Sequence, residues 1–152
     1  MILDDEVRCL RSLPFFASAD PSKLKRLAFT SDHMRFAPGQ VLFHEGDPGD
    51  AAYVILSGTV DVSVETPQGP IKVATADRNS IIGEIALLND GYRTATVTAS
   101  APLETLRIDK HEFLNLMKDC PSMMFGVLKV LSTRLTHTTM ELAKHKSAHE
   151  TA

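Results

Sequence analysis

The chain has 152 residues, of which 43% are hydrophobic and 23% are charged, and its formal net charge is -3. This is the composition of a soluble globular protein, and its mild acidity argues against a nucleic-acid-binding surface, which is usually basic. No apolar run approaches the ~20 residues that span a bilayer, and the acidic residues from Asp4 to Glu6 argue against a secretory signal. We therefore expect one cytoplasmic domain over residues 1–152, with neither nucleic acid nor membrane as a partner.

The N-terminal part, residues 1–35, is expected to be helical. Leu3, Val7 and Leu10 recur at the spacing of one helix face. Asp20 followed by Pro21 is typical of a second helix start, because the first turn is where proline's missing N–H does no harm.

Residues 36–108 consist of short β-type runs divided by turn residues. Val60, Val62 and Val64 alternate with polar residues, as in a strand with one buried face. Further runs lie at residues 41–43, 52–56, 71–74, 94–98 and 103–108. Many short strands at regular spacing predict a sandwich or barrel, an architecture that limits exposed sheet edges.

Residues 109–147 are expected to form two helices. Asp109 can cap the first, with Glu112 completing its start, and Pro121 begins the second. The second helix carries an apolar stripe at heptad spacing, formed by Met124, Leu128, Leu131, Leu135, Thr138 and Leu142. This stripe over residues 124–142 could pack on the β region, pair with a second copy in a homodimer, or do both.

One stretch, residues 83–97, interrupts the β pattern and carries chemistry. Glu84 to Leu88 are strong helix formers but give only one or two turns, whose N-terminal N–H groups favour an anion. Arg93, followed by the small residues Thr94 and Ala95, offers a guanidinium that can bind two phosphate oxygens at once. Together with a Glu84 carboxylate that accepts from a sugar hydroxyl, these groups fit a singly charged phosphate joined to a ribose. The alternative is a plain ion pair between Glu84 and Arg93.

The run Gly83-Glu84-Ile85-Ala86-Leu87-Leu88, followed by Arg93-Thr94-Ala95-Thr96-Val97, resembles the phosphate-binding cassette of the cyclic-nucleotide-binding domain family. That family includes the catabolite activator protein, protein kinase A regulatory subunits and cyclic-nucleotide-gated channels. The resemblance extends to residues 38–58 and covers about Leu13 to Leu142. It implies a mainly β fold with flanking helices: a double-stranded β-helix, or β-roll, of about eight strands with an N-terminal helical segment, a short cassette helix and two C-terminal helices.

By this resemblance the ligand site has two parts. Glu84 would bind the ribose 2′-hydroxyl and Arg93 the exocyclic phosphate oxygens, and Thr94 would reach a phosphate oxygen or the 2-amino group of guanine. Backbone groups lining the phosphate would come from Gly83, Ile85, Ala86 and Ala95. The base would meet apolar walls and the last helix at Val62, Val73, Ile82, Arg134 and Thr138.

The resemblance implies a sensor of cyclic AMP (cAMP), with cyclic GMP (cGMP) as second choice, that has no catalytic residues and needs neither a metal nor another cofactor. Ligand would draw the cassette inward, and a hinge around residues 113–121 would let the last helix close over the purine and signal to an effector protein. No DNA-binding domain is expected in this chain. Two alternatives remain open: an interaction module of the same fold that dimerises without ligand, and a cupin-like metalloenzyme, for which His44-Glu45-Gly46 lacks the His-x-His pair.

Overall fold

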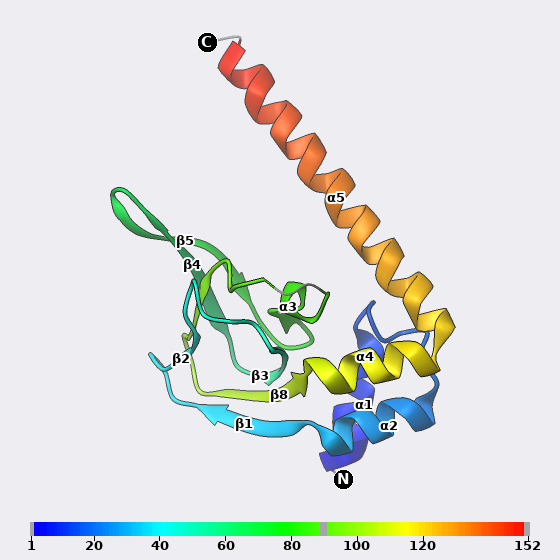
Figure 1. Cartoon of the computed structure of the whole chain (residues 1–152). Helices are drawn as coiled ribbons and strands as arrows, with labels where there is room; N and C mark the ends of the chain where they lie inside the picture. The colour runs from blue at the N-terminus through cyan, green and yellow to red at the C-terminus, as the bar shows by residue number, and fades with distance from the viewer. Residues whose placement is uncertain (1, 89–90, 151–152) are drawn as a thin grey trace.

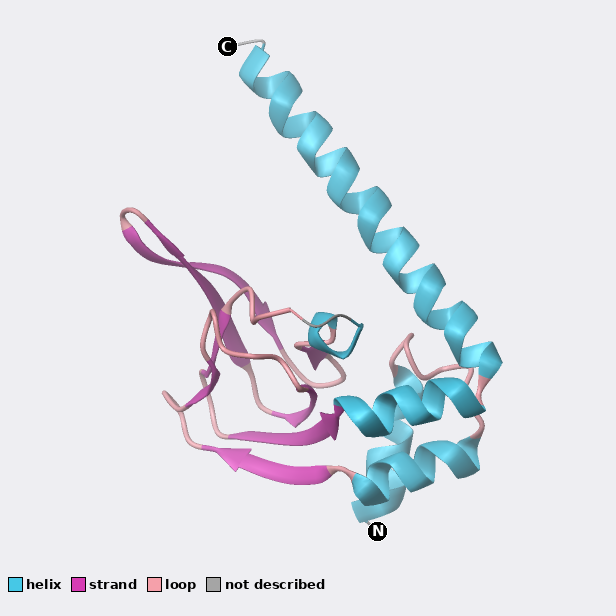
Figure 2. Cartoon of the chain, in the orientation of Figure 1, coloured by secondary structure: helices cyan, strands magenta, loops and turns pink. Residues whose placement is uncertain are grey.

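The computed structural model describes residues 2–88 and 91–150, and it places two β-sheets beside a group of helices, as Figure 1 and Figure 2 show. The helices are α1 (Ile2–Ser12), α2 (Pro21–Thr30), α3 (Ile85–Leu88), α4 (Lys110–Asp119) and α5 (Pro121–Glu150). The strands are β1 (Asp32–Phe36), β2 (Val41–Phe43), β3 (Ala51–Ser57), β4 (Val60–Thr66), β5 (Gly69–Ala76), β6 (Ile81–Ile82), β7 (Thr96–Ala99) and β8 (Leu103–Asp109). The described part of the chain thus confirms the expected β-roll of eight strands with flanking helices.

Each sheet has four antiparallel strands, in the orders β1-β8-β3-β6 and β2-β7-β4-β5. Strand β3 is central in the first sheet, and its residues 51–55 are all buried, which explains the unbroken apolar run there. Strand β4 is central in the second sheet and pairs with β5 on one side and β7 on the other. Strands β6 and β7 therefore bring the two ends of the cassette segment, residues 83–97, to different sheets.

The first strand begins earlier than the sequence predicted. Strand β1 starts at Asp32, inside the stretch expected to be helical, and pairs with β8 with Asp32 opposite Arg107 and Phe36 opposite Leu103. Only Phe36 of this strand is buried, so no alternating apolar pattern marks it, and its pairing with β8 defines it instead. At the other boundary β8 extends to Asp109, and α5 continues past residue 147 to Glu150.

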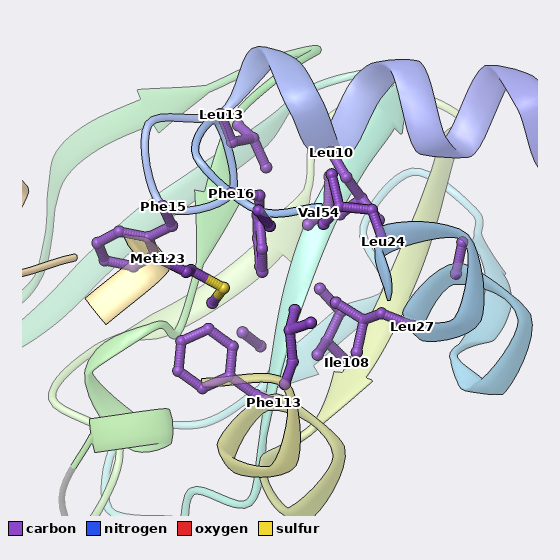
Figure 3. Close-up of a cluster of buried hydrophobic side chains, with 14 of the residues drawn as sticks. Leu10, Leu13, Phe15, Phe16, Leu24, Leu27, Val54, Ile108, Phe113 and Met123 are labelled. Carbon is purple, nitrogen blue, oxygen red and sulfur yellow. The ribbon is translucent and has the colours of Figure 1, made fainter. Parts of the chain in front are cut away.

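Helices α1, α2 and α4 pack together at one end of the roll (Figure 1). Asp20 and Asp109 cap α2 and α4, accepting from the backbone N–H of Ser22 at 3.2 Å and of His111 at 2.8 Å. The cap at Asp109 and the helix start at Asp20 were both predicted. The core between these helices and the first sheet, shown in Figure 3, includes Leu10, Leu13, Phe15, Phe16, Leu24, Leu27, Val54, Leu87, Ile108, Phe113 and Met123. Because this core contains Leu87 of α3, it joins the cassette to α4.

A second core fills the roll itself. It is formed by Phe36, Phe43, Tyr53, Ile55, Val60, Ile82, Val97, Ala99 and Leu103. Three aromatic rings contact one another in this core: Tyr53 meets Phe36 edge to face with centroids 6.2 Å apart, and it meets Phe43 in a tilted arrangement with centroids 6.0 Å apart. This core packs the strands together, and the candidate site is built from several of the same strands.

Helix α5 leads away from the rest of the molecule (Figure 1). Met123 and Val127 in its first turns are buried, whereas all residues from 132 to 144 are exposed. Most of the predicted apolar stripe is therefore uncovered, with Leu128 at 61% and Leu135 at 69% exposure, and only Leu131 is partly buried. Apart from Leu131, the stripe does not pack on the roll. None of the described helices combines the length and apolar character needed to cross a membrane.

Candidate functional site

A pocket of about 190 Å³ lies between β2, β4, β6, β7 and the segment that joins β6 to β7. Its lining residues are Phe43, Val62, Ile82, Gly83, Glu84, Tyr92, Arg93, Thr94, Ala95 and Val97. Seven of the residues predicted from the sequence are in this set. Among them are the glycine, the carboxylate and the arginine on which the prediction depended.

Arg93 is the buried cation of this pocket, with only 7% of its surface exposed. Its backbone is held on both sides, because its N–H donates to the carbonyl of Asp47 at 2.7 Å and its carbonyl accepts from the N–H of Gly46 at 2.8 Å. Its guanidinium donates from Nη2 to the carbonyl of Ala51 at 2.7 Å and from Nη1 to the carbonyl of Gly83 at 3.3 Å. Nε is buried and has no hydrogen-bond partner among the described residues.

The hydrogen bonds of Arg93 do not fully offset the cost of burying its positive charge. Burial lowers the pKa of Arg93, although Tyr53 and Asp50 partly oppose that shift. A buried cation with an unmatched N–H is costly unless an anion or acceptor is supplied. The arrangement is therefore suited to an anionic ligand.

Gly83 makes room for that guanidinium. A Cβ at this position would overlap Nη1 of Arg93 and would lie 3.4 Å from the ring of Phe43. Its φ of +76° is also in the region that side chains disfavour. Sterics thus explain why a glycine stands at the start of the cassette: a larger residue would clash with Arg93.

Glu84 forms an ion pair with Arg134 of α5. Its side chain is 14% exposed, and that of Arg134 is 45% exposed. Arg134 also lies over the ring of Phe15, with Cζ at 5.3 Å from the centroid. The plain Glu84–Arg93 ion pair that the sequence left open is wrong, and the carboxylate instead contacts the last helix.

Some predicted site residues lie elsewhere or are not described. Val73 is 56% exposed on β5 and does not line the pocket, and Thr138 is exposed on α5, one turn beyond Arg134. Ile85 and Ala86 belong to α3, and their side chains fall outside the described residues.

Three pocket residues were not among the named site predictions: Phe43, Tyr92 and Val97. Tyr92 and Val97 lie within the predicted cassette segment, residues 83–97, whereas Phe43 was taken as an ordinary strand residue. Phe43 and Val97 line the pocket because they are opposite each other in the β2–β7 pairing. Nothing in the sequence signalled that pairing. In the part of the chain that the structure describes, no three His, Cys, Asp or Glu side chains gather as metal ligands would.

The family model described as "Cyclic nucleotide-binding domain" matches residues 33–120, which is more than half of the chain. The match spans the roll, the whole cassette and α4, so the chain belongs to the cyclic nucleotide-binding domain family.

The similar proteins include an acetyltransferase and transcriptional regulators. The chain is 39% identical over 132 residues to the acetyltransferase Pat of Mycolicibacterium smegmatis, covering 86% of this chain and 39% of Pat. It is 29% identical to a CRP-like cAMP-activated global transcriptional regulator of Mycobacterium tuberculosis, covering 84% of this chain and 58% of the regulator. The crystal structure of the sensor domain of the transcriptional regulator DNR from Pseudomonas aeruginosa matches with a TM-score of 0.83 and 25% identity, over 92% of this chain and 95% of that one. The chain thus spans less than two thirds of the length of both curated relatives.

Proposed function

We propose that this chain is a cAMP sensor whose pocket binds the cyclic phosphate through Arg93 and the ribose through Glu84. The observation that carries the proposal is the buried guanidinium with an unmatched Nε, in the same pocket as a carboxylate. A cyclic monophosphate brings one negative charge for the cation and a 2′-hydroxyl donor for the carboxylate. Binding involves no chemical step, so we propose a regulatory module rather than a catalyst.

The pocket is smaller than the roughly 300–1,000 Å³ usual for small-molecule sites, since it measures about 190 Å³. A pocket of this size does not enclose a whole nucleotide, so we propose that another element covers the purine. Arg134 already connects α5 to Glu84, which makes α5 the candidate cover.

Calorimetric titration with cAMP, cGMP and 5′-AMP tests the proposal. We expect cAMP to bind most tightly. Cyclic GMP should bind more weakly, with Thr94 contacting its 2-amino group. The weakest ligand should be 5′-AMP, because its phosphate is an open dianion and not the singly charged cyclic phosphate that the site fits. The M. tuberculosis relative is itself described as cAMP-activated, which supports the choice of cAMP. If neither cyclic nucleotide binds, the sensor proposal is wrong and the ligand-free interaction module becomes the better interpretation.

We further propose that ligand moves α5. A ribose hydroxyl would compete with Arg134 for Glu84, so binding would release Arg134 to contact the purine and let α5 close over the base. Leu87 of the cassette is packed in the same core as Phe113 of α4, which provides a second mechanical link. For this to work the ligand must bind the closed arrangement more tightly than the open one.

Hydrogen exchange read by mass spectrometry measures the movement directly. With saturating cAMP we expect slower exchange in residues 132–144, all of which are exposed without ligand. 5′-AMP at the same concentration serves as the control. Unchanged exchange of this segment in cAMP-saturated protein would contradict the movement without affecting the binding proposal.

A second copy of this chain is the partner that we propose for the exposed α5 stripe. Leu128, Leu135 and Leu142 are each more than half exposed and recur every seven residues, as the seam of a coiled coil requires. Sedimentation velocity that finds only the monomer mass at micromolar concentrations would contradict this proposal.

A further inference from the structure

The ring of Phe43 lies against the guanidinium of Arg93, with Cζ 4.0 Å from the ring centroid. We propose that Phe43 is a positioning residue that holds Arg93 for the phosphate, an inference that rests on the proposed cyclic nucleotide site. Phe43 ends β2, is 9% exposed, and is paired with Val97 across the sheet. The ring is thus fixed by the strand on which it stands.

Three contacts together hold the guanidinium in place. Its Cζ lies over the Phe43 ring, and the carbonyls of Ala51 and Gly83 accept from Nη2 and Nη1. Nε remains as the donor without a partner. Because a guanidinium binds phosphate through N–H groups in a fixed planar fork, contacts that hold the whole group in place also set the direction in which its remaining N–H groups point.

The contact between the Phe43 ring and the guanidinium also offsets part of the cost of burying the positive charge of Arg93. Desolvation lowers the pKa of Arg93, and a ring face is an electrostatic partner that occupies none of the five N–H donors. A carboxylate in the same place would neutralise the cation and compete with the ligand. An aromatic ring therefore stabilises the charge of Arg93 while keeping it available to an incoming phosphate.

The alternative is that Phe43 only packs in the core, and the experiment must distinguish this role from the positioning of Arg93. Phe43 belongs to the core of the roll and contacts Tyr53 with centroids 6.0 Å apart. Phe36 is a matched control, because it packs on the other side of Tyr53 at 6.2 Å, is 7% exposed, and is not among the residues that line the pocket. A packing role predicts the same behaviour for both positions.

The experiment compares Phe43→Leu, Phe43→Tyr and Phe36→Leu with the wild-type chain by calorimetry. The ligands are cAMP and its two phosphorothioate diastereomers, in each of which one exocyclic oxygen is replaced by sulfur. In Phe43→Leu we expect cAMP affinity to fall about tenfold, and the preference between diastereomers to shrink, because the arginine no longer addresses one oxygen. Phe43→Tyr keeps a ring face and should retain affinity within about threefold, as should Phe36→Leu.

The outcomes distinguish this inference from the proposed function. If the wild-type chain binds no cyclic nucleotide, the proposed function and the positioning role fail together. If the wild-type binds and Phe43→Leu keeps both its affinity and its preference between diastereomers, the positioning role alone is wrong. Equal losses in Phe43→Leu and Phe36→Leu, or failure of Phe43→Tyr to restore affinity, also overturn it, because they identify a packing effect.

Discussion

Replacing Arg93 by methionine is expected to weaken cAMP binding by at least about 100-fold, which calorimetric titration can measure. A hydrogen bond to a charged group contributes about 1.5–3 kcal/mol, and each 1.4 kcal/mol corresponds to a tenfold change in affinity. Loss of two such bonds would leave the phosphate in the pocket without its cation, since Arg93 is the buried cation there. Methionine keeps much of the aliphatic stem that packs in the site, so the change isolates the charge and its donors.

The same variant should change the stability of the ligand-free protein very little. The variant loses the hydrogen bonds to the carbonyls of Ala51 and Gly83, which is unfavourable. It also removes a buried cation whose Nε has no partner, which is favourable. We expect these opposing effects to leave the free energy of unfolding in urea within about 1–2 kcal/mol of wild type. A much larger loss would identify Arg93 as a structural residue instead of a ligand-binding one.

Arg107 provides the matched control. It is a half-buried arginine on β8 that pairs with Asp50 at 3.3 Å and with Asp32 at 3.9 Å, and it does not line the pocket. Arg107→Met removes the same charge from the same domain, so its cAMP affinity should stay within about threefold of wild type, because ion pairs near the surface contribute little. Equal losses in both variants would point to a general effect of net charge.

Much of the pocket lining was predictable because most of it is local in sequence. Gly83, Glu84 and Arg93 belong to one short segment, so their residue types and spacing alone indicated an anion and a hydroxyl donor. The capping aspartates were also readable, because a cap depends only on the first turn of its own helix. Both the cassette and the helix caps are defined by interactions between residues that are close in sequence.

The parts that could not be predicted depend on pairing between distant strands or helices. Phe43 meets Arg93 only because β2 pairs with β7, and Arg134 meets Glu84 only because α5 leaves α4 at a particular angle. Val73 was wrongly predicted to line the site. It lies at an irregularity of the β4–β5 pairing, where Val62 is opposite Ala74 and Ser63 is opposite Lys72, so the expected facing of β5 residues is interrupted.

Gly58→Ala is expected to lower the free energy of unfolding by about 3–4 kcal/mol, the largest stability loss that we predict for a single methyl group. Gly58 joins β3 to β4 with a φ of +95°. A Cβ there would overlap the carbonyl oxygen of Pro102 and would lie 2.9 Å from Cα of Leu103. Both obstacles are backbone atoms at the start of β8, so no side-chain rotation relieves them.

Gly39→Ala separates the two causes of that loss. Gly39 has a similar φ of +88°, but a Cβ there meets nothing within 4 Å, so its substitution costs only backbone strain of about 1–2 kcal/mol. Thermal unfolding followed by circular dichroism should show a Tm about 10 °C below wild type for Gly58→Ala and less than about 5 °C below for Gly39→Ala. Equal shifts would mean that the chain between β3 and β4 can move away from Pro102, and that the close approach of the two backbones contributes nothing to the stability of the roll.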